Sequence, residues 1–258
     1  MIQMEFGYIG WRYPKFEVFT MKQRGITILL PTLDEARGLR NVVERIPFKD
    51  IASEGWDTRI VVVDGGSTDG TIELAAELNC EIIRQHSGSG KGRGLREAFS
   101  IFMNSNDLTL VMMDADGTYR PEEITTLIKK IDEDDVDIVI GSRMKGWIES
   151  GAMSRRNWIG NHMLTWLAVF LHGTYVSDLC TGFWVLSRNA IEKMELNSIG
   201  FEIEAEMYAA AAHNGLVIRE VPIHYDRRIG DSKLGSIADG IRIAMKIIRR
   251  RFVRKPIS

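Results

Sequence analysis

The chain has 258 residues, of which 45% are hydrophobic and 26% charged, and its formal net charge is −2. This length allows a sizeable core in one large or two small domains, and the near-neutral charge gives no reason to expect a nucleic-acid partner. Cys80 and Cys180 form neither a disulfide framework nor a metal-ligand pattern, so we expect a reducing, cytoplasmic compartment. The longest apolar stretch, residues 158–171, is shorter than the roughly 20 residues of a membrane-spanning helix.

From residue 26 onward the hydrophobic pattern predicts strands that alternate with helices. We expect strands at 26–30, 59–63, 81–84, 108–113 and 137–141, and helices at 35–46, from 72, at 92–104 and at 121–131. This alternation is typical of βαβ units, so we predict an α/β fold with a largely parallel central sheet. We divide the chain into an N-terminal extension (1–24), a main domain (25–235) and a basic amphipathic C-terminal helix (236–258).

Polar motifs follow four of the predicted strands at the point where each strand ends. They are residues 32–35, Asp64, residues 114–116 and the pair Ser142-Arg143. Ligands of such sheets bind outside the carboxyl ends of the strands, so these motifs should converge on one edge. Asp69, by contrast, is interpreted as a helix cap.

The sequence Asp114-Ala115-Asp116 places two carboxylates one residue apart directly after a buried strand. Two such groups can reach one hard divalent cation such as Mg²⁺, which takes oxygen ligands and needs few from the protein. Asp and Gly are also common in ordinary turns, so from these residues alone a turn and a metal site remain open.

The glycine-rich segment 88–92 resembles a P-loop superficially but lacks its spacing. No glycine lies five residues before Gly90, and Gly92 stands where a Ser or Thr would hold magnesium. The first strand–helix turn likewise has no G-x-G-x-x-G. A glycine loop with Lys91 ahead of a helix can still approach an anion, and the alternative is a flexible loop with a solvated lysine.

Taken together, the motifs of this chain and their order resemble those of the inverting GT-A glycosyltransferases of family 2. Within that family they resemble most the dolichol-phosphate mannose synthase and polyprenyl-phosphate glycosyltransferase group. The resemblance runs from about Ile26 to Leu234. It rests on Pro31-Thr32-x-x-Glu35, Asp64-x-x-Ser67-x-Asp69-Gly70-Thr71, Gly90-Lys91-Gly92, Asp114-Ala115-Asp116, Gly141-Ser142-Arg143, Arg155-Arg156-Asn157, Asp178-x-x-Thr181-Gly182-Phe183, residues 202–207 and Asp226-Arg227-x-x-Gly230-x-Ser232-Lys233-Leu234.

This resemblance implies a Rossmann-like GT-A fold, a nucleotide-sugar donor, a divalent metal (Mg²⁺ or Mn²⁺) and a dolichyl or polyprenyl phosphate acceptor. It also implies roles for individual residues. The nucleotide sugar would contact Pro31, Thr32, Glu35, Asp64, Lys91, Asp114, Ala115 and Asp116, with the metal on Asp114 and Asp116. The catalytic residues would be Asp116, Arg143 and Asp178, and the acceptor phosphate would contact Arg227, Ser232 and Lys233.

Two positions depart from the family pattern. Gly65 stands where the family often has a second aspartate after Asp64, and Thr118 stands where mannose synthases usually carry a glutamine that ligates the metal. We therefore favour a UDP-hexose or UDP-N-acetylhexosamine donor over GDP-mannose. Two alternatives are a family 2 enzyme with a soluble sugar or glycan acceptor and a non-catalytic nucleotide-sugar-binding protein. The basic group Arg227, Ser232 and Lys233 suits a phosphate acceptor better than a neutral sugar.

The C-terminal helix is predicted to be amphipathic. Ile237, Ile241, Ala244, Ile248 and Phe252 share one face, and residues 226–258 are strongly basic. Such a helix, with the apolar stretch 158–171, predicts peripheral attachment to the cytoplasmic face of a membrane. The alternative is a helix docked on the sheet with a solvated basic face.

Overall fold

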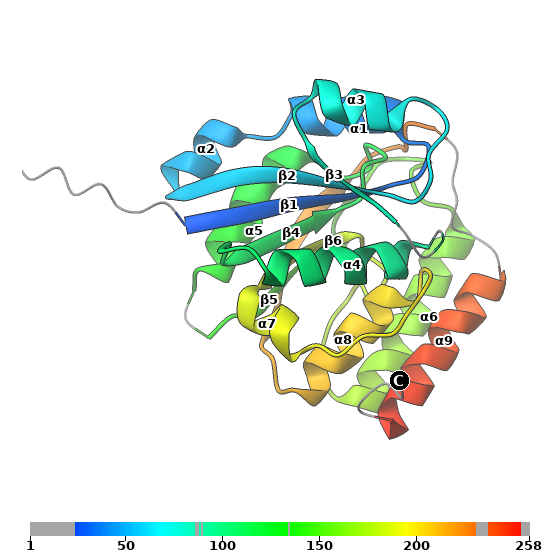
Figure 1. Cartoon of the computed structure of the whole chain (residues 1–258). Coiled ribbons are helices and arrows are strands. Elements are labelled where there is room, and N and C mark those ends of the chain that lie inside the picture. The colour runs from blue at the N-terminus through cyan, green and yellow to red at the C-terminus, as the bar shows by residue number, and fades with distance from the viewer. Residues whose placement is uncertain (1–23, 86–87, 89, 134, 231–236, 254–258) are drawn as a thin grey trace, which may run out of the picture.

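The computed structural model describes residues 24–85, 88, 90–133, 135–230 and 237–253, which fold around a seven-stranded sheet (Figure 1). The strand order is β3-β2-β1-β4-β6-β5-β7. β6 is antiparallel to β4 and β5, and the other neighbouring strands pair in parallel. The predicted α/β fold with a largely parallel sheet is therefore confirmed. The strands are β1 Arg24–Thr32, β2 Trp56–Asp64, β3 Glu81–Arg84, β4 Thr109–Met113, β5 Ile138–Ile148, β6 Phe183–Ser187 and β7 Ile218–Tyr225.

Helices cover both faces of the sheet. One face packs against α1, α2, α3 and α5, and the other packs against α4 and the helices that follow β5 (Figure 1). The helices are α1 Ala36–Glu44, α2 Phe48–Ser53, α3 Thr71–Glu77, α4 Lys91–Met103, the 3₁₀ turn η1 Pro121–Glu123, α5 Ile124–Ile131, α6 Arg155–His172, α7 Arg188–Lys193, α8 Ile203–His213 and α9 Ile237–Phe252.

Strand β1 explains why the sheet has two cores. Its side chains alternate, so Ile28 and Leu30 pack on the side of α1 while Leu29 packs on the side of α4. All three side chains have no exposed surface. Burying one such side chain stabilises the fold by roughly 1.5–3 kcal/mol, so a strand buried on both faces is apolar throughout.

The structure differs from the predicted elements in several places. The predicted helix ends before Pro47, but the chain then forms the short helix α2. The fifth strand continues to Ile148, well beyond the predicted Gly141. Strands β6 and β7 were not predicted. β6 runs antiparallel to both of its neighbours and so departs from the strand–helix alternation.

Helix α9 packs beside α6 and α8 (Figure 1). Its buried side chains Ile243 and Ile247 join the core on that side of the sheet. Within the described residues, no helix is long and apolar enough to cross a bilayer. The expected C-terminal helix is present, and residues 1–23 and 254–258 lie outside the described residues. The division into an extension, a domain and a helix stays a prediction.

Helix α1 also sets the position of the loop that follows β4. Gly38 packs so closely on this loop that an added Cβ would lie 2.3 Å from the carbonyl oxygen of Ala115 and 2.8 Å from the Cα of Asp116. Both contacts are with backbone, which cannot rotate away as a flexible side chain can. A glycine is therefore required where α1 crosses the loop that carries the two aspartates.

We predict that Gly38→Ala lowers the free energy of unfolding by about 1–3 kcal/mol, because the added methyl overpacks a rigid contact. Gly160→Ala in α6 is the matched control. A Cβ there meets nothing within 4 Å, so the change should be neutral or stabilising by up to about 1 kcal/mol. Urea unfolding measures both, and equal stabilities for the two variants would contradict the predicted packing constraint.

Candidate functional site

A cavity of about 710 Å³ lies at the edge of the sheet where β1, β2 and β4 end. This is the edge at which parallel α/β sheets bind ligands. The wall includes several residues that the sequence analysis singled out: Pro31, Thr32, Glu35, Lys91, Asp114, Ala115, Asp116 and Arg143. Side chains from distant segments of the sequence are thus brought together at one site.

Asp114 leaves the end of β4 and forms an ion pair with Lys91. The distance from Lys91 Nζ to Asp114 Oδ1 is 2.7 Å, and the same ammonium lies 2.7 Å from Glu204 Oε1 of α8. Burial alone would lower the pKa of Lys91, but these two carboxylates raise it above its ordinary value, so the lysine is charged. The alternative of a solvated lysine is wrong, because only 13% of the Lys91 side chain is exposed.

Glu204 was not identified as a site residue from the sequence. Burial raises its pKa, and Lys91 opposes that shift. It lines the cavity in the first turn of α8. The sequence did contain a signal for Glu204: it is a carboxylate in a helix whose other side chains are mostly apolar. A carboxylate that is buried in such a helix needs a cationic partner.

Asp116 is buried and holds the other carboxylate of the pair. Its Oδ1 accepts hydrogen bonds from the backbone N–H (2.9 Å) and the hydroxyl (2.5 Å) of Thr118. Its Oδ2 forms an ion pair with the guanidinium of Arg228. Thr118 therefore fixes the orientation of Asp116 as a turn residue would, while Asp116 Oδ2 remains directed to a cation.

Arg228 is a second residue that the sequence analysis missed. Besides Asp116 it contacts Glu35, with 3.2 Å from Nη1 to Oε1. Burial would lower its pKa, but Asp116 and Glu35 raise it. The backbone places it there, because Ile229 N–H donates to the Asp116 carbonyl and Asp226 N–H donates to the Thr118 carbonyl. The sequence shows two adjacent arginines here, Arg227 and Arg228, but it does not show which of them lines the cavity. In the structure it is Arg228.

The donor set at Asp114 and Asp116 fits a hard divalent ion. Both carboxylates reach the cavity wall, and each already has a cationic partner in Lys91 or Arg228. Among the described residues, no three His, Cys, Asp or Glu side chains form a closed metal cage. Mg²⁺ does not require one, since it is commonly bound through one or two carboxylates together with substrate phosphates and water.

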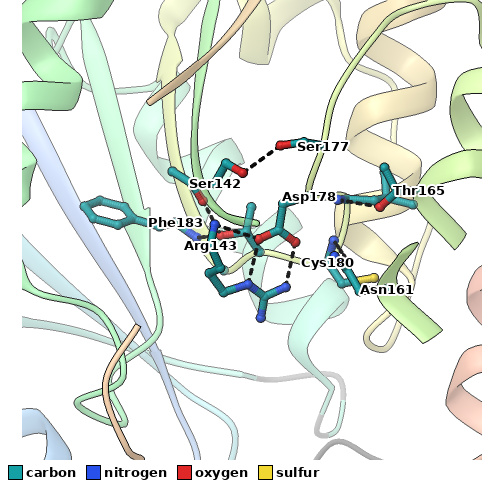
Figure 2. Close-up of polar contacts among 12 residues, drawn as sticks. Ser142, Arg143, Asn161, Thr165, Ser177, Asp178, Cys180 and Phe183 are labelled. Carbon is teal, nitrogen blue, oxygen red and sulfur yellow. Dashed lines mark hydrogen bonds and ion pairs between the residues drawn. The ribbon is translucent and has the colours of Figure 1, made fainter. Parts of the chain in front are cut away.

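Arg143 of β5 points its guanidinium toward Asp178 (Figure 2). Two parallel bonds of 2.7 Å join Arg143 Nε and Nη2 to the two carboxylate oxygens, and the Arg143 backbone N–H donates to the same carboxylate. Burial would lower the pKa of Arg143, but Asp178 raises it well above the ordinary value. Asp178 is fully buried and does not line the cavity, so its contact with the site passes through Arg143.

Helix α6 holds the segment that carries Asp178 (Figure 2). The Thr165 hydroxyl accepts from the backbone N–H of Leu179, and the Asn161 side chain accepts from that of Cys180. Burial raises the pKa of the Cys180 thiol to about 12, so this cavity-lining cysteine is protonated at neutral pH and is not a nucleophile. The helix thus supplies rigid support for the Arg143–Asp178 pair.

Two aspartates of the second motif serve the local backbone. Asp64 accepts hydrogen bonds from the N–H groups of Gly66 (2.9 Å) and Ser67 (3.0 Å) and does not itself line the cavity. Asp69 accepts from Ala36 N–H at the start of α1 and from Thr71 N–H at the start of α3. Asp69 therefore satisfies the first N–H group of each helix, although the N-cap residues themselves are Gly70 and Glu35. The predicted nucleoside contact of Asp64 stays a prediction.

The predicted acceptor residues are not gathered in the described part of the cavity. Arg227 is exposed, does not line the cavity and donates to the Ser150 carbonyl at 2.6 and 2.8 Å. Ser232 and Lys233 lie outside the described residues. The assignment of an acceptor phosphate to these three residues stays a prediction.

Comparison with known proteins gives one family and a consistent set of relatives. Residues 27–195 match the family described as glycosyl transferase family 2. Glycosyltransferase AglJ of Haloferax volcanii is 36% identical over 90% of this chain and 74% of its own length. Polyprenol monophosphomannose synthase of Mycolicibacterium smegmatis is 30% identical over 84% of this chain and 83% of its own length.

A solved structure shares the fold. Glucosyl-3-phosphoglycerate synthase from Mycobacterium tuberculosis, crystallised with Mn²⁺, UDP-glucose and phosphoglyceric acid, superposes with a TM-score of 0.69 at 18% identity. The match covers 96% of this chain and 88% of that one. The predicted GT-A architecture is therefore confirmed at the level of the fold.

We predict that Asp178→Asn lowers the free energy of unfolding by about 3–5 kcal/mol, because it leaves the buried Arg143 guanidinium without its counter-ion. Glu122→Gln is the control, since it breaks the exposed pair with Arg45 and should change stability by less than about 1 kcal/mol. Chemical unfolding of both variants measures the difference. A loss below 1 kcal/mol for Asp178→Asn would mean that the buried pair contributes no more than a surface pair.

Proposed function

The chain belongs to glycosyl transferase family 2, and we propose that it moves a hexose or N-acetylhexosamine from a nucleotide sugar to dolichyl or polyprenyl phosphate. One observation carries the proposal: a single cavity holds Asp114 and Asp116 together with the cations Lys91, Arg143 and Arg228. Carboxylates for a divalent ion beside several cations suit a reaction between two phosphate-bearing substrates. The relative named a polyprenol monophosphomannose synthase supports a lipid phosphate as the acceptor.

The donor would occupy the β1 and β4 side of the cavity. Pro31, Thr32 and Glu35 would contact the nucleoside, with Asp64 shaping the adjacent turn. Asp114 and Asp116 would hold Mg²⁺ or Mn²⁺, which when bound neutralises the charge that grows on the departing nucleoside diphosphate. Lys91 would contact the diphosphate through its ammonium group, which lines the cavity beside Asp114.

The acceptor chemistry explains why the site needs no general base. A sugar hydroxyl is a weak nucleophile at neutral pH and requires one, whereas a phosphate monoester is already an anion. The protein must then hold and aim the phosphate. We assign this to Arg143, kept rigid by Asp178, and to Arg227, Ser232 and Lys233. Attack opposite the diphosphate inverts the anomeric centre and gives a β-linked product from an α-linked donor.

We predict that the protein transfers radiolabelled sugar from a UDP- or GDP-sugar to polyprenyl phosphate in a metal-dependent reaction. Asp116→Ala should slow this transfer more than about 100-fold, because charge stabilisation at the leaving group is lost. Asp57→Ala, exposed at the opposite end of β2, should leave it unchanged. Label recovered in the organic phase measures transfer, and the product's anomeric configuration reports inversion.

Three results would contradict the proposal. They are label that stays in the aqueous phase with every donor, full transfer in excess EDTA, and a product that retains the donor's configuration. Transfer only to a soluble sugar would instead support the alternative acceptor class. A protein that binds nucleotide sugar but transfers to neither acceptor would support the non-catalytic alternative.

We further propose that the face formed by α6 and α9 rests on the cytoplasmic surface of a membrane. The two helices lie side by side, and both leave large apolar side chains exposed. Trp166 and Phe170 of α6 stack on each other and are each 73% exposed, and Phe252 of α9 is 80% exposed. Helix α9 packs on the rest of the protein through Ile243 and Ile247, which lie on a different face from the exposed residues. The predicted face stays largely open, since Ile237, Ile241, Ile248 and Phe252 are all exposed.

The charge around this face favours an anionic bilayer over another protein. Arg242, Arg249 and Arg251 are exposed on α9, and Arg155 and Arg156 are exposed at the start of α6. Each basic residue near an anionic surface contributes roughly 1 kcal/mol, and aromatic side chains insert at the headgroup level. An exposed apolar patch with a basic rim is therefore suited to reversible attachment.

We predict that the protein sediments with anionic liposomes at low salt and that added salt releases part of it. Trp166→Ser with Phe170→Ser should weaken this binding about tenfold or more, because the inserted apolar surface is lost. Phe48→Ser on α2 removes another exposed aromatic side chain, away from α6 and α9, and should not change binding. Equal sedimentation with neutral and anionic vesicles, or no effect of the double variant, would overturn the proposed surface.

A further inference from the structure

The guanidinium of Arg228 forms ion pairs with two of the carboxylates that the proposed donor site requires, Asp116 and Glu35. Its guanidinium is paired with Asp116 Oδ2 and lies 3.2 Å from Glu35 Oε1, while only 24% of its side chain is exposed. Asp116 is assigned to the metal and Glu35 to the nucleoside. A single side chain therefore covers the contact points of both halves of the donor.

Backbone hydrogen bonds hold the residues on either side of Arg228. Its guanidinium can therefore leave Asp116 by rotation of the side chain, without a movement of the backbone. Ile229 N–H donates to the Asp116 carbonyl at 2.8 Å, and Asp226 N–H donates to the Thr118 carbonyl at 2.8 Å. A bridge between Tyr119 and Tyr225 continues this pairing. Rotation of the side chain alone would uncover Asp116 and keep the guanidinium at the cavity.

We infer that Arg228 is an internal counter-ion of the metal site, which neutralises Asp116 when no cation is bound and is displaced when a divalent ion and a nucleoside diphosphate bind together. This inference rests on the metal site of the proposed function. Two buried or half-buried negative charges without partners would be costly, so a site that must be stable when empty needs an exchangeable cation.

The exchange makes binding of the two ligands cooperative. A divalent ion alone must compete with Arg228 for Asp116. The displaced guanidinium then loses its ion pair with Asp116 and gains no new anionic partner. When a nucleoside diphosphate is present, its phosphates accept the displaced guanidinium while the aspartates accept the metal. Every charge then keeps a partner, so each ligand raises the affinity for the other.

Arg40 of α1 provides a matched comparison for this role. It carries the same charge and is also paired with two carboxylates, Glu44 and Glu77, but it is exposed and does not line the cavity. A substitution at either position changes the net charge equally. A difference between the two variants therefore reports the contact with Asp116 and excludes a general electrostatic effect.

The test measures Mn²⁺ binding to the full-length protein by the electron paramagnetic resonance signal of free Mn²⁺, with and without UDP or GDP. We expect Arg228→Gln to bind Mn²⁺ alone about tenfold more tightly than the unmodified protein, and to lose most of the enhancement by nucleotide. Arg40→Gln should match the unmodified protein in both. Arg228→Lys, which keeps the charge on a shorter, more flexible side chain, should lie between them.

Thermal melting of each variant verifies that it is folded, and Arg228→Lys retains the test if Arg228→Gln is not. Unchanged or weaker Mn²⁺ binding by folded Arg228 variants overturns the inference alone, as does an equal gain in Arg40→Gln. Absence of Mn²⁺ binding in every protein, with or without nucleotide, overturns both the inference and the metal part of the proposed function. Failure of sugar transfer with Mn²⁺ binding as expected overturns only the proposed acceptor reaction.

Discussion

Two carboxylates at the end of a buried strand constrain the rest of the site. Asp116 is almost fully buried and Asp114 is three-quarters covered, and burying a charge is costly unless a partner is supplied. Their partners come from segments far away in the sequence, Lys91 at the start of α4 and Arg228 after β7. The need to neutralise one strand end therefore fixes the positions of two loops that would otherwise have no reason to meet.

The second charged pair is arranged differently and has a different consequence. Arg143 and Asp178 form a closed, bidentate contact in which the carboxylate is fully buried and satisfied by three hydrogen bonds from one residue. Such a pair is costly to break and holds its geometry, whereas Arg228 shares two carboxylates and can be exchanged for a ligand. The cavity thus combines one rigid cation with one exchangeable cation.

The sequence was informative where local rules decide the structure and weak where long-range pairing does. Strand β3 is found at the predicted bounds, and the β4 aspartates lie in the cavity, because alternation and strand-end position follow from the nearby residues. Strands β6 and β7 were missed, since their pairing with β4 and β5 is decided by tertiary packing. Arg227 was selected over Arg228 because a motif gives the residue type, while the register of β7 against the Asp116 loop decides which side chain faces inward.

Helix α9 connects the polar cavity with the apolar outer face. Arg242 and Ile243 line the cavity, while Ile241, Met245 and Ile248 on the same helix are exposed, and α9 packs against α6. A phosphate on a long apolar chain has to place its charged end among cations while the chain stays out of water. Helix α9 borders both environments, so the phosphate could lie in the cavity while the apolar chain lies along the outer face of the same helix. A soluble sugar acceptor would use the cavity but would leave the exposed apolar face without a role, and contiguous apolar surface of this kind usually marks an interaction site.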